Sequence, residues 1–236
     1  MSFLSHPWDI SPKDARKLQR KLAPLVIRKC RITTIKTVAG IDVAIKGSIA
    51  CAAVVVLAFP GLEVVAQATA TRRIAFPYIP GLLTFREGPA IIDALERLDR
   101  KPDLLIFDGQ GIAHPSRFGI ASHIGLLVDL PSIGCAKSRL WGRYQEPEFK
   151  LGSHIPLVDH GETIGAIVRT RSGIKPVFVS IGHRMDLKTC IDVVLACCKG
   201  YRLPETTRKA HRLAEECKKL KLVCFAHNGM MKLGIF

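Results

Sequence analysis

Residues 74–114 read IAFPYIPGLLTFREGPAIIDALERLDRKPDLLIFDGQGIAH, and this stretch decides how the rest of the chain is arranged. Its first part, residues 76–81, holds an aromatic residue between two prolines. Proline fixes its own φ and lacks a backbone N–H, so this part is predicted to be a stiff projecting loop with Tyr78 near its tip. Pro89 suits a first helical turn, and residues 104–107 are predicted to form a buried strand. The stretch therefore predicts a rigid aromatic loop, a carboxylate at a helix start and a second carboxylate at a strand end.

The order of the predicted elements indicates the fold class. Apolar residues at helical spacing predict helices over residues 12–26, 90–98, 120–130, 186–198 and 205–220. Apolar and β-branched runs predict strands over residues 38–44, 49–57, 62–70, 104–107, 132–136, 165–170 and 176–181. A turn at Gly47 and Ser48 makes the first two strands an antiparallel hairpin. Three antiparallel strands followed by alternating helices and strands predict an α/β fold, a ribonuclease-H-like mixed sheet flanked by helices.

Length and composition narrow the class of protein. With 236 residues, 48% of them apolar, the chain suits one domain over residues 1–236, with a tail of open role from about residue 217. The longest apolar run, residues 49–59, is too short for a membrane span, and no secretory leader is visible, so a cytoplasmic monomer is expected. The 8 cysteines include no C-x-x-C pair, which argues against a zinc site or a disulfide framework.

The charge balance indicates a polyanionic partner. The chain carries 35 Lys and Arg against 20 Asp and Glu, which gives a net charge of +15. A protein this basic commonly binds nucleic acid, and a generally basic surface is the alternative interpretation.

Three carboxylates stand in surroundings that do not suit a solvated charge. Asp42 lies within the apolar run AGIDVA, Glu87 lies in FREGPA, and Asp108 follows the buried run LLIF. Buried carboxylates are normally paired or bound to a metal. If the strands that carry Asp42 and Asp108 are neighbours, the two acids face each other, and Glu87 can join them from its helix. Clustered oxygen ligands suit Mg²⁺, with Mn²⁺ as a substitute.

Each candidate also has a structural alternative. Asp108 before a glycine is a common turn residue, and Glu87 can be an ordinary charge at a helix start. His211 can position or protonate a reacting group from the last helix, or it can be a plain surface histidine. Tyr78 can enter a base stack as a wedge, or it can pack beneath the proline turn. The candidates for phosphate contacts, each with a solvated alternative, are Lys137, His114, Arg86, Arg139 and Arg208.

Three motifs resemble the endonuclease V family, whose members are deoxyinosine-directed nucleases. They are PYIPGLLTFREGPA, FDGQGIAHPSRFGIASHIGLLVDLPSIGCAKSRLWG and ETTRKAH, and the resemblance runs from about residue 8 to residue 212. It implies a ribonuclease-H-like fold and Mg²⁺-dependent hydrolysis of DNA at hypoxanthine. The family cuts the second phosphodiester on the 3′ side and leaves a 3′-hydroxyl and a 5′-phosphate.

The resemblance also implies roles for individual residues. Asp42 and Asp108 match the family's metal-binding acids, and Glu87 matches its third catalytic carboxylate. His211 matches the histidine of the last helix near the active site, and Lys137 matches the lysine near the bond to be cut. The residues that match the strand-separating wedge are Pro77, Tyr78, Ile79 and Pro80. The residues that match the base pocket, largely through backbone, are Gly81, Leu83, Gly109, Gly119 and Ile120.

Two other functions stay open at this point. The first is an inosine-specific endoribonuclease on the same scaffold, because some family members prefer RNA. The second belongs to another class, a non-catalytic protein that binds nucleic acid. The intact acids Asp42, Glu87 and Asp108 argue against the second function.

Overall fold

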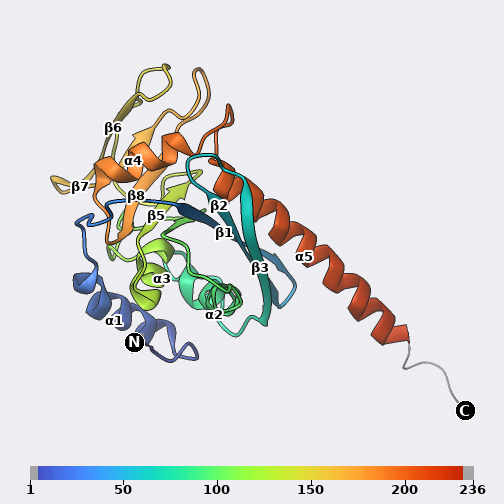
Figure 1. The fold of residues 1–236 in the computed structure, drawn as a ribbon. Coiled ribbons are helices and arrows are strands. Elements are labelled where there is room, and N and C mark those ends of the chain that lie inside the picture. Colours follow the sequence, from blue (N-terminus) through green and yellow to red (C-terminus); the bar gives the residue numbers. More distant parts are fainter. Residues whose placement is uncertain (1–4, 231–236) are drawn as a thin grey trace, which may run out of the picture.

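An eight-stranded mixed sheet forms the centre of the molecule in the computed structural model, which describes residues 5–230 and, along the last helix, side chains as far as Lys219 (Figure 1). The spatial order of the strands is β3-β2-β1-β4-β5-β8-β7-β6. The strands are β1 (Thr37–Lys46), β2 (Ile49–Ala58), β3 (Val64–Arg73), β4 (Leu104–Phe107), β5 (Ser132–Ala136), β6 (His154–Asp159), β7 (Glu162–Val168) and β8 (Val177–His183).

Strand directions follow the ribonuclease-H-like pattern. The hairpin β1–β2 and the pair β2–β3 are antiparallel, whereas β1–β4 and β4–β5 are parallel. On the far side of β5, the pairs β5–β8, β8–β7 and β7–β6 are antiparallel. This arrangement confirms the predicted mixed sheet. It also places the carboxyl end of β4 beside the middle of β1, since Phe107 is in register with Ile41 and β1 continues to Lys46.

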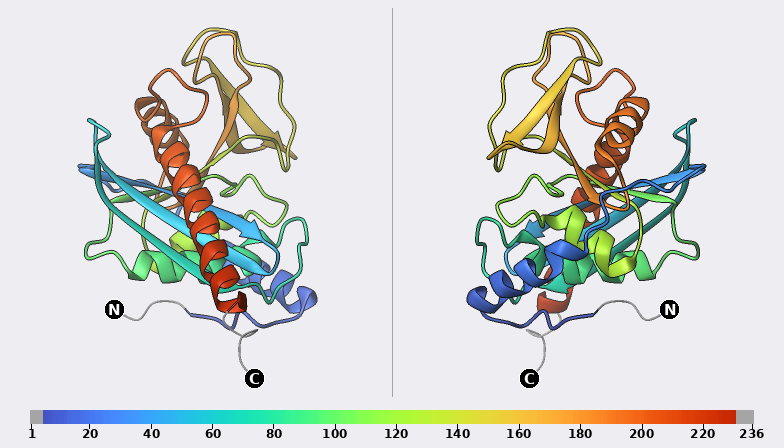
Figure 2. Two further views of the ribbon diagram at one scale, coloured as in Figure 1. Left: turned by 90° about the vertical axis from the view of Figure 1, so that its right-hand side faces the viewer. Right: turned by 90° about the vertical axis from the view of Figure 1, so that its left-hand side faces the viewer.

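Helices cover both faces of the sheet. They are α1 (Pro12–Leu22), α2 (Leu83–Glu96), α3 (Ile120–Val128), α4 (Leu187–Ala196) and α5 (Glu205–Met230), and a 3₁₀ turn, η1 (Ala23–Leu25), follows α1. Figure 2 shows α5 lying across one face of β1 and β2, with α1, α2 and α3 on the other side. None of these helices, over residues 5–230, is long and apolar enough to cross a membrane.

Alternation along β1 explains which side chains meet which helix. Ala39 and Ile41 are buried in the cluster that contains Ala90 and Ile91 of α2. Successive side chains of a strand point to opposite faces, so the even-numbered positions of β1 face α5. Asp42 is one of these even-numbered positions. The sheet therefore directs this carboxylate toward α5.

The structure corrects the predicted position of Pro89. The helix begins at Leu83, so Pro89 lies inside α2 and Glu87 lies one turn from its start. Proline lacks the N–H that an interior helical position uses, and this cost normally favours a helix that begins at proline. Burial offsets the cost here, because Leu82 and Phe85 pack with Phe76 in a compact apolar cluster.

Other differences lie at element boundaries and at the edge of the sheet. The predicted helix over residues 12–26 ends at Leu22 and continues as η1, and the third strand is shifted to Val64–Arg73. Strand β6 was not predicted, because it is a half-exposed edge strand that contains Pro156. The tail from about residue 217 continues α5 to Met230, and residues 231–236 lie outside the described part of the chain.

Candidate functional site

Asp42 in the middle of β1 lies beside Asp108, which directly follows the end of the parallel strand β4. Ile41 of β1 is in register with Phe107 of β4, and the Asp108 N–H donates a hydrogen bond to the Ile41 carbonyl at 3.3 Å. Their side chains are only 15% and 12% exposed. The structure therefore brings together the two acids that the sequence separates by more than sixty residues.

Glu87 reaches the same place from α2. Desolvation, followed by the negative charge of Asp42, raises the pKa of Glu87 to about 8. Arg86 opposes this rise, and Asp108 adds to it. The pKa of Asp42 is raised as well, first by burial, against the hydrogen bond from His211, and further by Asp108. Because the charge of Asp42 raises the pKa of Glu87 and the charge of Asp108 raises the pKa of both, the three carboxyl groups are electrostatically coupled.

Two basic side chains are paired with this cluster. The Nδ1 atom of His211 lies 2.6 Å from Oδ2 of Asp42, and Nζ of Lys137 forms an ion pair with the Asp108 carboxylate. Within the described residues, no three Asp, Glu, His or Cys side chains are already arranged around a metal position. In this arrangement His211 and Lys137 each occupy a carboxylate that a cation could otherwise use.

Contact between α5 and β1 fixes the place of His211. A Cβ on Gly40 would lie 2.0 Å from the Thr206 carbonyl oxygen, so β1 and the start of α5 approach each other as closely as glycine permits. Thr206, Ala210 and Ala214 are fully buried on this side of α5. His211 follows Ala210 and lies at the edge of the buried face, where its ring reaches Asp42.

The aromatic loop projects as predicted. Tyr78 is 69% exposed, whereas Phe76 at the base of the loop is buried and its ring centroid lies 5.5 Å from that of Phe85. Arg86 supports the same base, because Nη1 donates to the Phe76 carbonyl at 3.1 Å. The loop is thus anchored at one end and presents its tyrosine to solvent.

A pocket of about 320 Å³ lies between this loop and the acid cluster. Its size is that of a small-molecule site. It contains every residue predicted for the base pocket, three of the four predicted for the wedge, and both Asp108 and Lys137. The full lining is Tyr78, Ile79, Pro80, Gly81, Leu83, Thr84, Asp108, Gly109, Gln110, His114, Gly119, Ile120, Ala136, Lys137, Ser138, Arg139 and Leu140.

Two helices begin at this pocket without a side-chain cap. Leu82 precedes α2 and Gly119 precedes α3, and neither makes a side-chain capping hydrogen bond. The first backbone N–H groups of a helix have no intrahelical acceptor and carry a partial positive charge. Leu83 and Ile120, the first residues of the two helices, both line the pocket. The pocket can therefore offer backbone donors to a ligand that carries oxygen or nitrogen acceptors.

The structure gives His114 a different role from the predicted phosphate contact. The ring is 3% exposed, Nδ1 accepts from the Ser116 N–H, and Nε2 lies 3.0 Å from the Gly81 carbonyl. Both ring nitrogens are used inside the protein, and desolvation lowers the pKa of His114 to about 4. A neutral imidazole whose two nitrogens both have hydrogen-bond partners inside the protein has no free N–H donor and no positive charge for a phosphate. His114 instead supports the backbone of the pocket.

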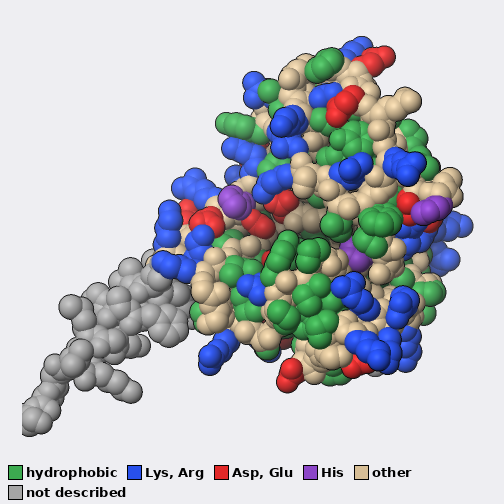
Figure 3. All heavy atoms as spheres, turned by 180° about the vertical axis from the view of Figure 1, so that it is seen from behind, with side chains coloured by type: hydrophobic (Ala, Val, Ile, Leu, Met, Phe, Trp, Pro, Cys, Tyr) green, Lys and Arg blue, Asp and Glu red, His purple; other side chains and the backbone are tan. Residues whose placement is uncertain are grey.

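The predicted arginines differ in their surroundings. Arg139 is exposed beside the pocket, with its guanidinium 5.9 Å from the centre of the Tyr144 ring. Arg208 pairs with Glu205 on α5 and lies over the ring of Tyr201. Arg139 is thus the better placed of the two for an anion in the pocket. Figure 3 shows that Lys and Arg side chains are widespread on the face seen there, both above and below its middle.

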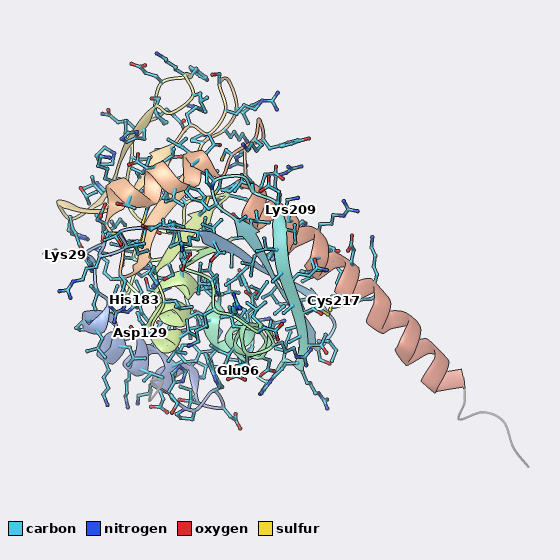
Figure 4. The ribbon with its side chains drawn as sticks, in the orientation of Figure 1. Lys29, Glu96, Asp129, His183, Lys209 and Cys217 are labelled. Carbon is cyan, nitrogen blue, oxygen red and sulfur yellow. The ribbon has the colours of Figure 1, made fainter. Side chains whose placement is uncertain are left out.

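Some residues near the site were not among those predicted from the sequence. Gln110, Thr84 and Ser138 line the pocket, and the Gln110 side chain donates to the Ser138 carbonyl at 3.0 Å. Another buried histidine, His183, does not line the pocket. It lies at the end of β8, where its Nε2 atom is 3.3 Å from Oδ1 of Asp129 (Figure 4). Only the position of Gln110 within the DGQG motif pointed toward the site.

Known proteins match this chain over nearly its whole length. The family model described as Endonuclease V matches residues 20–212. An endonuclease V of Roseiflexus sp. (strain RS-1) is 55% identical over 208 residues, 88% of this chain and 94% of the relative. The crystal structure of endonuclease V from Streptomyces avermitilis has a TM-score of 0.88 at 42% identity and covers 93% of this chain and 98% of that one.

A further solved structure contains nucleic acid. It is endonuclease V of Ciona intestinalis in complex with a 24mer DNA that contains an inosine followed by a ribo-adenosine. Its TM-score is 0.77 at 26% identity, over 89% of this chain and 98% of that chain.

Proposed function

The chain belongs to the endonuclease V family of nucleases, and from this membership we propose that it is a metal-dependent endonuclease that recognises deoxyinosine in DNA. In this proposal it hydrolyses the second phosphodiester on the 3′ side of the lesion and leaves a 3′-hydroxyl and a 5′-phosphate. The observation that carries the proposal is the acid cluster beside the pocket, since Asp108 belongs to both.

Asp42, Asp108 and Glu87 are the residues that would hold Mg²⁺, with Mn²⁺ as a substitute. Their oxygen donors and their mutual repulsion both suit a hard divalent cation. When bound, such a cation activates water and neutralises charge on the phosphate. His211 and Lys137 pair with two of these acids, so they are the basic groups that would lie beside a phosphate at this place.

Base recognition is assigned to the pocket and the loop beside it. Hypoxanthine carries a carbonyl where adenine carries an exocyclic amine. Backbone donors at the starts of α2 and α3 match that carbonyl and oppose an amine. Tyr78 is exposed at the rim, where an aromatic wedge can enter a base stack and hold the target nucleotide out of it. A mispaired inosine also costs less to extrude than a paired base.

Inosine-containing RNA is the second candidate substrate. The Ciona intestinalis protein was bound to DNA with a ribonucleotide directly after the inosine. A contact to a 2′-hydroxyl near the cut is what would separate the two substrates. The net charge of +15 serves binding to either polyanion.

A cleavage assay on four matched oligonucleotides tests this function. The strands are DNA and RNA of one sequence, each with inosine or adenosine at a single position, incubated with Mg²⁺ or with EDTA. We expect Mg²⁺-dependent cutting of the inosine DNA at the second phosphodiester on the 3′ side. If only the inosine RNA is cut, the protein is an inosine-specific endoribonuclease. If the adenosine strands are cut equally well, inosine recognition is refuted.

A further inference from the structure

One buried side chain outside the pocket touches both backbone segments that form it. Gln19 of α1 is 1% exposed. Its Nε2 atom donates to the Gly81 carbonyl at 2.8 Å and to the Phe118 carbonyl at 3.3 Å. These acceptors lie 62 and 99 residues away along the chain. A single amide group therefore joins three distant parts of the sequence.

The two acceptors have matching places in the fold. Gly81 directly precedes Leu82, the residue before α2, and Phe118 directly precedes Gly119, the residue before α3. Both helices begin at the pocket without a side-chain cap. Gln19 thus bonds the chain just before each of the two helix starts that offer backbone donors to a ligand.

The peptide group that follows Gly81 is held on both of its sides. Its carbonyl accepts from Gln19 and lies 3.0 Å from Nε2 of His114, and its N–H, which belongs to Leu82, donates to the Ile79 carbonyl at 2.9 Å. Gly81 has a φ of +81°, a conformation that glycine adopts freely and leaves as freely. The hydrogen bonds supply the rigidity that the residue itself lacks.

We propose that Gln19 is a positioning residue for base recognition, which fixes the spacing between the N-termini of α2 and α3 across the pocket. The inference rests on the proposed function, because it takes the pocket as the site of the extruded base. Backbone donors select a base only when held in place, since a small displacement lengthens the hydrogen bonds that discriminate it. Gln19 does not touch the base itself.

The test compares wild type with Gln19→Met, which keeps the length of the side chain and removes both donors. The readout is the ratio of dissociation constants for adenosine and inosine in matched single-stranded DNA, measured in EDTA so that cleavage plays no part. We expect the ratio to fall about fivefold or more, as for the loss of a buried hydrogen bond. Leu22→Val, a change at another buried position of α1, is the control and is expected to keep the wild-type ratio.

Gln19→Glu provides a second readout that a general loss of packing would not produce. A buried glutamate donates a hydrogen bond only while it is protonated. A protonated carboxyl has one O–H and can replace one of the two bonds, so we expect this variant to recover part of the wild-type ratio in acid and to lose it as the pH rises, relative to wild type at each pH. This variant decides the question if Gln19→Met does not fold.

The possible results separate the two claims. The role of Gln19 is overturned if Gln19→Met discriminates inosine from adenosine as well as wild type does. It is also overturned if the ratio of Gln19→Glu follows that of wild type at every pH. Either result leaves the proposed function standing. If wild type itself binds the inosine and adenosine strands equally, the proposed function and this inference both fail.

Discussion

At the scale of single residues, the site contains two groups whose charged form the protein opposes. Glu87 has a pKa raised to about 8 by desolvation and by Asp42, while His114 has a pKa lowered to about 4 by burial. Both groups are therefore held mostly neutral near pH 7 by their surroundings. For Glu87, the arrangement is costly for folding and suits cation binding. For His114, it suits a fixed hydrogen bond.

Glu87→Gln is expected to stabilise the fold while it removes activity. A carboxyl whose folded pKa lies above its unfolded value loses stability as the pH rises from about 4.5 to about 8. The variant escapes this loss, so in EDTA its free energy of unfolding should exceed that of wild type by a margin that grows over this range. Denaturation at several pH values measures the margin. A variant less stable than wild type at pH 8 would contradict the electrostatic cluster.

His114→Gln is expected to flatten the acid side of the stability profile. The folded pKa of about 4 lies below the unfolded value of 6.5, so the unfolded chain binds one more proton between them. Wild type therefore loses stability as the pH falls through this window, at roughly 1.4 kcal/mol per pH unit from this group. Urea denaturation between these limits should give a smaller slope for the variant. Equal slopes would mean that His114 is not held neutral.

Sequence reasoning at this scale succeeded where a residue type conflicts with its neighbours. Asp42 is a charged residue in an apolar strand, and this conflict was visible without the structure. Gln19 shows no such conflict, because a glutamine on a polar helix is ordinary. Its partners are two backbone carbonyls from distant segments, and backbone atoms leave no pattern in a sequence. The role of His114 was hidden for the same reason.

At the scale of elements, the packing of α5 on β1 places the histidine of the site. Gly40 allows the approach, since any Cβ there would collide with the Thr206 carbonyl. The apolar run of β1 and the helical spacing of α5 were enough to predict the two elements separately. Their closeness could not be predicted, because it depends on the absence of a side chain at one position.

Gly40→Ala is expected to displace the start of α5 and to weaken the His211 contact. The new methyl would lie 2.0 Å from a backbone oxygen, which cannot rotate away as a flexible side chain can. A loss of a few kcal/mol of stability is expected, as for other overpacked interiors. Thermal denaturation together with single-turnover cleavage measures both effects. Unchanged stability and rate would show that α5 does not need this close approach.

The start of α2 illustrates the limit of local rules. Proline at a first helical turn is a sound expectation, yet burial of Leu82 and Phe85 begins the helix at Leu83. The difference matters for the site. It moves Glu87 from a solvated helix end to an inner turn beside Asp42 and Asp108.

At the scale of the whole molecule, the sheet gathers residues from five separated parts of the chain around the carboxyl end of β4. Strands β1 and β4 supply Asp42 and Asp108, α2 supplies Glu87, the segment after β5 supplies Lys137, and α5 supplies His211. The order of strands made the meeting of Asp42 and Asp108 predictable, since β1 and β4 are parallel neighbours, but it did not predict the approach of α5. The basic character of the chain adds attraction for a polyanion without fixing where it binds.

The most direct test of this convergence compares wild type with Asp108→Asn, a change that keeps the size of the side chain and removes its charge. Both proteins are incubated with Mg²⁺ and single-inosine DNA under single-turnover conditions, after circular dichroism has shown equal folding. We predict cleavage by wild type at the second phosphodiester 3′ to the inosine and a rate at least about a thousandfold lower for the variant. A folded Asp108→Asn protein that cleaves at the wild-type rate would contradict the account.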